Sequence, residues 1–157
     1  MVRSDTFFPW QHRMLGWLLG WGVGSVVVGA GLVTDAQPTV RQIGIQAVAW
    51  GAIDAVRAWN GRRNARARQH ESEAEAAKRR PLVEEVKRFR TIIAVNTGLD
   101  VLYVLGGLWL AQTAGKRASR RGTGLGIALQ GVFLLGFDGY LWRQLLRQPD
   151  NEWSNGA

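Results

Sequence analysis

Three aspartates interrupt otherwise apolar stretches of this sequence. Asp54, Asp100 and Asp138 each lie in a hydrophobic block that is long enough to form a buried or membrane-embedded helix. An ionisable group in hydrocarbon costs about 2.5 to 3.5 kcal/mol on insertion scales, so such groups face the interior of a helix bundle and find polar partners there. The chemistry that we expect of these carboxylates is the binding of a proton, a small cation or a polar solute.

Other polar residues accompany the aspartates at helical spacing. Gln46 lies two turns before Asp54, Asn96 lies one turn before Asp100, and Gln130 lies two turns before the third aspartate. Residues four apart in a helix share a face, so each pair marks one polar stripe. The candidate polar or cation site therefore comprises Asp54, Asp100, Asp138, Asn96, His12, Gln46 and Gln130.

Glycines recur at every fourth position near the start of the chain. Gly16, Gly20 and Gly24 follow His12 along one helical face. Small residues at this spacing allow the backbone of a neighbouring membrane helix to approach closely. We therefore expect the three glycines to form a helix-packing face and His12 to join the polar site.

Two interpretations of the polar cluster remain open. In the first, the groups satisfy one another and only fix the register of the helices. The pairs would then be Asp54 with Arg57, Asp138 with Arg13 or His12, and Asp100 with Asn96 and Tyr103. In the second, three carboxylates outnumber the nearby cations, so that one aspartate is protonated or a cation or polar ligand fills the gap.

Four apolar blocks carry these residues. A helix of about 20 apolar residues crosses the ~30 Å hydrocarbon core of a bilayer, and each block approaches that length. The sequence therefore predicts an all-α fold, a bundle of four transmembrane helices in which residues 1–157 form a single integral membrane domain. The expected spans are residues 14–33, 43–59, 91–114 and 122–142.

Basic residues are concentrated in the middle of the chain. Half of the Lys and Arg residues lie between Arg57 and Arg88, and we expect residues 60–90 to form a basic, helical cytoplasmic loop. The positive-inside rule then places both termini in the cytoplasm, although the cluster from Lys116 to Arg121 opposes that orientation. The basic loop would bind anionic lipid headgroups, at about 1 kcal/mol per residue. No nucleic-acid partner is expected, because a basic stripe without a binding fold is a weak signal.

A shift of 84 residues places the second apolar block over the fourth. The shift aligns Ile45–Val48 with Leu129–Val132, and Ile53–Ala55 with Phe137–Gly139. Two helical hairpins that are copies of one unit would account for this alignment. Because both hairpins begin on the same side, the sequence favours two tandem parallel hairpins.

Several classes of chemistry are not expected from the composition. The chain has no cysteine, and its histidines are limited to His12 and His70, so we expect no metal site and no cofactor. No nucleophile and base stand together in a motif, so we expect no enzyme activity.

The run NTGLDVLYVLGG from Asn96 to Gly107, together with the four-span layout, resembles an uncharacterised family of small bacterial four-helix membrane proteins. The resemblance implies a helical membrane fold in a bacterial inner membrane. It implies no activity.

Two functions remain as hypotheses. We expect a non-enzymatic structural or accessory membrane subunit or scaffold, either as a homo-oligomer or bound to another membrane protein. The alternative is a small transporter or channel for protons, cations or a polar solute, built on the aspartate cluster. A cavity that reaches Asp100 would favour the alternative, and a closed, fully hydrogen-bonded cluster would favour the scaffold.

Overall fold

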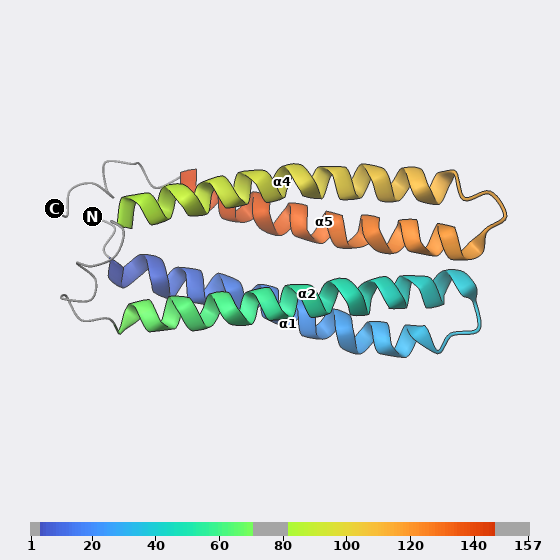
Figure 1. The fold of residues 1–157 in the computed structure, drawn as a ribbon, viewed down its shortest axis with the longest axis horizontal. Coiled ribbons are helices and arrows are strands. Elements are labelled where there is room, and N and C mark those ends of the chain that lie inside the picture. Colours follow the sequence, from blue (N-terminus) through green and yellow to red (C-terminus); the bar gives the residue numbers. More distant parts are fainter. Residues whose placement is uncertain (1–3, 71–81, 147–157) are drawn as a thin grey trace.

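Two long helical hairpins lie side by side in the computed structural model, which describes residues 4–70 and 82–146. Both hairpins run in the same direction, with the start of the first helix and the end of the last helix at one end of the bundle, called the terminus end, and the two turns at the other (Figure 1). The predicted all-α fold of four helices is confirmed, and no described residue lies in a strand. The helices are α1 (Ser4–Val33), α2 (Pro38–Gln69), α4 (Leu82–Gln112) and α5 (Ala118–Leu146).

The turns that close the hairpins follow from their residues. Between α1 and α2, a side-chain oxygen of Asp35 accepts a hydrogen bond of 2.7 Å from the backbone N–H of Gln37. Pro38 then begins α2, at a position where the missing N–H of proline is tolerated. Between α4 and α5, Gly115 has a φ of 55°, a left-handed conformation that favours glycine.

Within each hairpin the helices touch through glycines. A Cβ atom added to Gly22 of α1 would lie 2.7 Å from the backbone oxygen of Gly51 of α2. In the second hairpin, a Cβ added to Gly107 of α4 would lie 2.7 Å from the backbone oxygen of Gly124 of α5. Such close backbone approach is how membrane helices gain packing energy without a hydrophobic driving force.

The packing face that we expected from the sequence is corrected by these contacts. A Cβ added to Gly20 or Gly24 would meet nothing within 4 Å, and one added to Gly16 would meet only the side chain of Arg62. The face of α1 that contacts α2 is the one that carries Gly22 and Gly29. The spacing of four was read correctly as a shared face, but α2 packs on a different side of the helix.

The hairpins are joined mainly through α2 and α5. Gly126 of α5 lies against the side chain of Gln46, so the two helices approach closely near the turns. The indole of Trp21 on α1 stacks on the ring of Phe133 on α5, with 3.7 Å between the ring centroids. At the end that carries the termini, a hydrophobic cluster contains residues of α1, α4 and α5: Phe7, Phe8, Met14, Val86, Ile93, Leu141 and Leu145.

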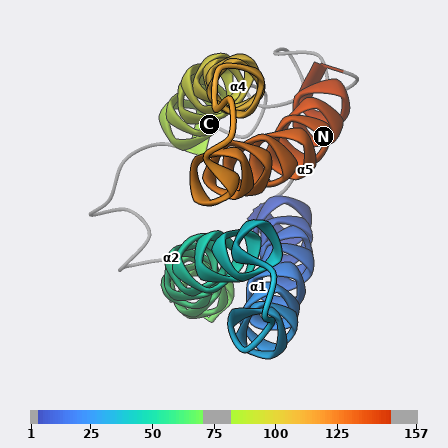
Figure 2. The same cartoon turned by 90° about the vertical axis from the view of Figure 1, so that its right-hand side faces the viewer.

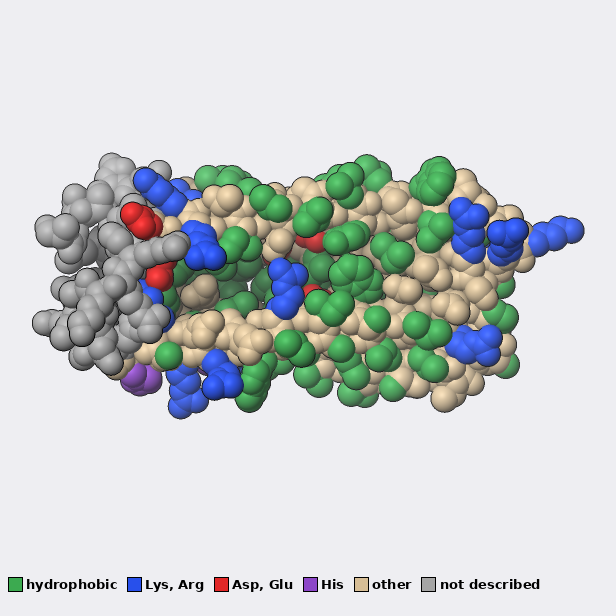
Figure 3. All heavy atoms as spheres, in the orientation of Figure 1, with side chains coloured by type: hydrophobic (Ala, Val, Ile, Leu, Met, Phe, Trp, Pro, Cys, Tyr) green, Lys and Arg blue, Asp and Glu red, His purple; other side chains and the backbone are tan. Residues whose placement is uncertain are grey.

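Three of the helices are long and apolar enough to cross a membrane. These segments are Phe7–Val33, Glu84–Gln112 and Ala118–Leu146. Large hydrophobic side chains cover much of the outer surface of the bundle, as on the face in Figure 3. An apolar exterior of this kind suits contact with lipid rather than water.

The expected second span, residues 43–59, lies in α2, which is not one of these three segments. The apolar half of α2 continues without a break into arginines, including Arg62, Arg66 and Arg68, which lower its hydropathy. Its first half packs against α1 and α5, so its crossing would depend on those neighbours. That residues 43–59 cross a membrane stays a prediction.

Residues 60–69 and 82–90 of the predicted loop are helical, and His70 between α2 and the undescribed segment is in a turn. Residues 60–69 continue α2, and α4 begins at Leu82, so both helices extend beyond the expected spans. Residues 71–81 lie outside the described residues. The extended parts of α2 and α4 therefore both lie at the terminus end of the bundle (Figure 1).

Candidate functional site

A cavity of about 350 Å³ lies between the two hairpins. All four helices contribute to its lining, and Figure 2 shows them surrounding the bundle axis. The three aspartates of the candidate site all line this cavity, although they come from α2, α4 and α5. Their side chains are nearly inaccessible, with exposed fractions of 4% for Asp54, 3% for Asp100 and 6% for Asp138.

Two of the aspartates have amide partners from other helices. The side-chain amide of Gln130 on α5 donates a hydrogen bond of 2.5 Å to Asp54 on α2, which links the two hairpins. Asp138 on α5 interacts with the side-chain amide of Asn96 on α4. A hydrogen bond to a charged group contributes about 1.5 to 3 kcal/mol, so these contacts fix both carboxylates.

Asp100 differs from the other two. Its Oδ2 atom is buried and has no hydrogen-bond partner among the described residues. A buried polar atom without a partner is rare in folded proteins and commonly marks a site for a ligand, an ion or water. Asp100 therefore provides the open acceptor of the cavity.

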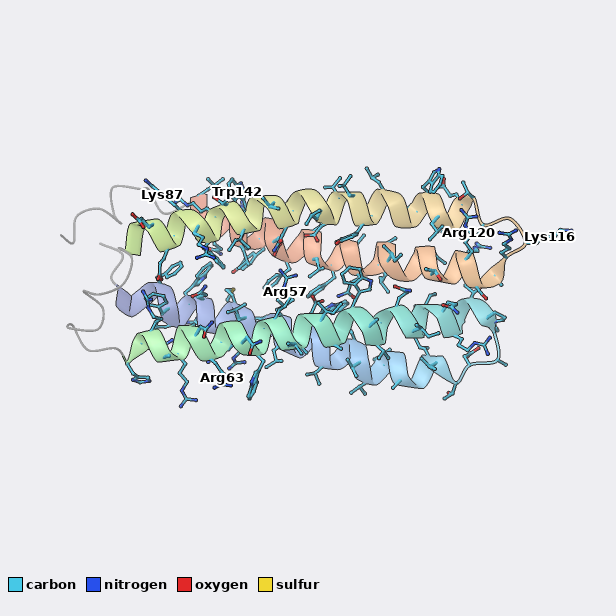
Figure 4. The ribbon with its side chains drawn as sticks, viewed as in Figure 1. Arg57, Arg63, Lys87, Lys116, Arg120 and Trp142 are labelled. Carbon is cyan, nitrogen blue, oxygen red and sulfur yellow. The ribbon has the colours of Figure 1, made fainter. Side chains whose placement is uncertain are left out.

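One cation faces the three carboxylates. The charge of Arg57 acts on Asp54, Asp100 and Asp138, and in the described part of the chain its guanidinium forms no ion pair with them. Figure 4 shows Arg57 in the middle of the bundle, between the hairpins. Its side chain is exposed, and Figure 3 shows a hollow on this face between α2 and α4. With all groups ionised, the lining of the cavity has more negative than positive charge.

Aromatic rings form part of the cavity wall. Trp50 of α2 and Tyr103 of α4 both line it, and their ring centroids lie 5.1 Å apart. Phe89 and Phe137 line the same space from α4 and α5. An aromatic face attracts cations through the ring quadrupole, most strongly where water is excluded. The wall therefore has the two features that organic ammonium ions prefer, carboxylates and aromatic faces.

A second cavity, of about 480 Å³, adjoins the first on the side of the chain termini. The two share the lining residues Gln11, Gly61, Phe89 and Ile92. An ion pair of 2.8 Å between Arg68 of α2 and Glu85 of α4 lies in the wall of this outer cavity. Toward the turns, by contrast, the close contact of α2 with α5 narrows the bundle. The acidic cavity is thus approached from the end with the termini.

Three members of the predicted site, His12, Gln46 and Gln130, do not line the acidic cavity, although the amide of Gln130 reaches Asp54. His12 accepts a hydrogen bond of 3.4 Å from Nε of Arg62 and, with Arg13, lines a different groove between α1 and α5. The expected pairing of Asp138 with His12 or Arg13 is therefore replaced by the contact with Asn96. Gln46 lies against Gly126 in the contact between α2 and α5.

The sequence did not assign several residues that line the cavity. Gln11 faces the cavity where His12, the next residue, does not, because successive helical positions point about 100° apart. Gly61 also lines the cavity, although it lies in the segment expected to be a solvated loop. The polar side chain of Gln11, next to His12 and Arg13 in the first part of α1, was the signal that could have revealed the first.

The donor set does not suit a metal ion. Among residues 4–70 and 82–146, no group of three or more His, Cys, Asp or Glu side chains is close enough to hold one. The three aspartates share a cavity without converging on a point. A small organic cation, which needs only one carboxylate as its direct partner, fits this arrangement better than a bare metal ion.

The chain belongs to a family of unknown function, DUF6992, whose model matches residues 17–139. The matched region contains all three aspartates, Asn96 and Gln130. The resemblance to an uncharacterised family that the sequence indicated is thereby confirmed. No curated protein and no solved structure matches the chain.

Proposed function

We propose that this protein is a small membrane transporter that binds an organic cation of about the size of a simple amine in the acidic cavity between its hairpins. The single observation that carries the proposal is the buried Oδ2 atom of Asp100, which has no hydrogen-bond partner in the described part of the chain and lies in a cavity with an excess of carboxylates. An ammonium or guanidinium N–H placed there would give this oxygen a charge-assisted hydrogen bond.

The size and lining of the cavity support a small organic ligand. Its volume of about 350 Å³ is at the lower end of the ~300 to 1,000 Å³ found for small-molecule sites. Trp50 and Tyr103 offer aromatic faces to the carbon atoms and the charge of such a ligand, while Asp54 and Asp138 surround it with negative charge. Arg57 at the open side would disfavour a second cation in the same cavity.

The location of the cavity supports transport. A solute would enter through the outer cavity beside Arg68 and Glu85 and would meet the aspartates part of the way along the bundle. The narrow contact of α2 with α5 would then have to open to release it toward the turns. Movement of one parallel hairpin against the other about a central site is a mechanism that repeat-built transporters use.

The proposed environment is the cell membrane of a bacterium, with four crossings and both termini in the cytoplasm. Basic residues at the terminus end of the bundle, such as Arg63 and Lys87 in Figure 4, support this orientation. Lys116 and Arg120 at the turns oppose it, as the same figure shows. The basic end would also meet anionic lipid headgroups.

The scaffold hypothesis stays as the second candidate. It requires that the polar groups satisfy one another, and the contacts of Asp54 with Gln130 and of Asp138 with Asn96 favour it. The unpartnered oxygen of Asp100 and the cavity beside it favour ligand binding instead. We propose no enzyme activity and no nucleic-acid partner, for the reasons given from the sequence.

The proposal is tested by calorimetric titration of the purified protein in lipid nanodiscs. The ligand is tert-butylamine, and its neutral isostere tert-butanol reports binding that does not need charge. We expect the amine to bind and the alcohol not to bind. Asp100→Asn should weaken the binding of the amine by about tenfold or more, since a charged hydrogen bond contributes ~1.5 to 3 kcal/mol.

The matched control is Asp35→Asn. This aspartate lies in the turn between α1 and α2, and an asparagine there can still accept the hydrogen bond from Gln37. Equal affinity of wild type and Asp100→Asn would overturn the site. Uptake of the radiolabelled amine into proteoliposomes, in excess of that into protein-free liposomes, then separates a transporter from a binding subunit. The neutral amine crosses lipid unaided, and a scaffold would not raise that rate.

A further inference from the structure

A groove on the outside of the bundle runs between α1 and α5. Its volume is about 1320 Å³, and its walls include Trp17, Trp21, Phe133 and Tyr140. Figure 2 shows α1 and α5 as neighbours on the side of the bundle away from α2 and α4. The two helices are bridged there by the stacked rings of Trp21 and Phe133, which close the floor of the groove without close backbone contact.

Glycines on both sides of the groove face open space. An added Cβ at Gly20 of α1 or at Gly136 of α5 would meet nothing within 4 Å. Neither glycine is needed for a contact between the described helices, although glycine in a helix is less favourable than alanine by about 0.5 to 1 kcal/mol. The space beside these two glycines is part of the groove, and a larger side chain at either position would occupy it.

The terminus end of the groove is basic. Arg13 and His12 line it from α1, and Arg62 reaches it from α2, with its guanidinium lying over Gly16. The charge of Arg66 also acts on His12. No acidic residue is among the described residues that line the groove. The other end is apolar, so the groove has the polarity of a site for a molecule with an anionic head and a hydrocarbon tail.

The length of the groove matches one leaflet of a bilayer. From Pro9 to Trp21 the helix rises about 18 Å at ~1.5 Å per residue. Half of the ~30 Å hydrocarbon core is about 15 Å. Another cavity, of about 340 Å³ and distinct from the outer cavity described above, shares Gly20 and Trp21 with the groove. It continues along α1 past Gly24 and Val28. An acyl chain that starts at the basic end therefore has apolar surface along its whole length.

We propose that an anionic phospholipid occupies this groove, with its phosphate at Arg13, Arg62 and His12 and an acyl chain along Gly20, Trp21 and Gly136. The charge complementarity of the basic end selects an anionic lipid over a zwitterionic one. The inference rests on the proposed residence in a membrane. It does not rest on the cation cavity, which faces another side of α1.

The experiment uses native mass spectrometry of the full-length protein with phosphatidylglycerol and, separately, phosphatidylcholine that carries the same acyl chains. We expect wild type to retain phosphatidylglycerol preferentially. Arg13→Gln with Arg62→Gln should lower that retention by about tenfold or more. Arg63→Gln with Arg88→Gln, two exposed arginines at the same end outside the groove, is the matched control and should change retention by less than about twofold.

A second pair of variants tests the tail. Gly20→Leu with Gly136→Leu should fill the groove and release the lipid, while Gly98→Leu with Gly106→Leu fills open space on α4 and should leave retention unchanged. Should the first pair fail to fold, the arginine pair alone decides.

Equal retention of the two lipids, or equal loss in the control variants, would overturn the proposal. Displacement of the lipid by inorganic phosphate would also overturn it, in favour of a site for a free anion. A dimer that Gly20→Leu with Gly136→Leu disrupts, without any effect on lipid, would assign the groove to a second copy of the chain. Retention of phosphatidylglycerol by Asp100→Asn would separate this site from the cation cavity.

Discussion

The acidic cavity and the basic groove lie on neighbouring faces of the same helix. Gln11 of α1 faces the cavity between the hairpins, and the next residue, His12, faces the groove beside α5. The cavity is lined by all four helices and has buried carboxylates, whereas the groove lies on the outside of the bundle and has arginines at one end only. A bundle of four helices is thus large enough for two sites of opposite charge.

The two regions also use glycine in opposite ways. Beside the cavity, Gly51 and Gly22 bring α2 against α1, and any side chain there would meet backbone. Beside the groove, Gly20 and Gly136 meet no protein atom and leave space. A glycine in a membrane helix is therefore evidence of either close packing or an unfilled site, and only the neighbouring helix tells which.

The largest effect is expected when a glycine that packs two helices together is replaced by a larger residue. A Cβ at Gly51 would lie 2.7 Å from the backbone oxygen of Gly22 and 2.8 Å from Cβ of Ser25, so Gly51→Leu has no room. We expect it to destabilise the protein by about 3 kcal/mol or more, at the upper end of the range for overpacking, because backbone cannot move aside. Denaturation by SDS in mixed micelles measures this change.

Gly20→Leu is the comparison variant for this prediction. Its side chain enters open space, and we expect the free energy of unfolding to change by less than about 1 kcal/mol. Equal destabilisation by the two substitutions would mean that the contact between α1 and α2 does not depend on Gly51. The distinction between packing glycines and groove glycines would then be wrong.

A smaller effect is expected when the hydrogen bond between Gln130 and Asp54, which links the two hairpins, is removed. Gln130→Leu removes the 2.5 Å bond to Asp54 and leaves a buried carboxylate without its donor. We expect a loss of about 1 to 3 kcal/mol in the same unfolding assay.

The control for Gln130→Leu is Gln144→Leu. The amide of Gln144 donates 2.9 Å to the hydroxyl of Tyr140 one turn away, on an exposed part of the same helix. Its removal should change stability by less than about 0.5 kcal/mol. A loss as large as that of Gln130→Leu would show that burial of the partner is not what makes the bond between the hairpins important.

Much of the fold could be predicted from the sequence because apolar length is a strong signal. Three of the four blocks coincide with helices that are long and apolar enough to cross a membrane, and the hairpin of α1 and α2 follows from the turn at Asp35. The extension of α2 as far as Gln69 shows a limit. Helix propensity continues through arginines that do not fit a hydrophobic span.

The site was predictable in part for a similar reason. The need to bury a carboxylate is strong enough to bring Asp54, Asp100 and Asp138 into one cavity, whatever the details of packing. The partners were not predictable, because Gln130 reaches Asp54 across the contact between α2 and α5, and periodicity reports only one helix at a time. The same limit explains His12, whose face could be assigned only once the position of α5 was known.

The smallest expected effect concerns the entrance to the acidic cavity. Glu85→Gln removes the charge that pairs with Arg68 across α2 and α4, at side chains with exposed fractions of 25% and 14%. A pair of this kind contributes about 1 kcal/mol or less, so stability should fall only slightly and the difference should shrink as salt is added. Glu84→Gln, at the exposed neighbouring position of α4, is the control.

Because the ion pair lies in the wall of the outer cavity, entry of the amine in the uptake assay should change while its affinity at equilibrium stays constant. An altered affinity would instead mean that Glu85 contributes to binding and that the outer cavity is part of the binding site.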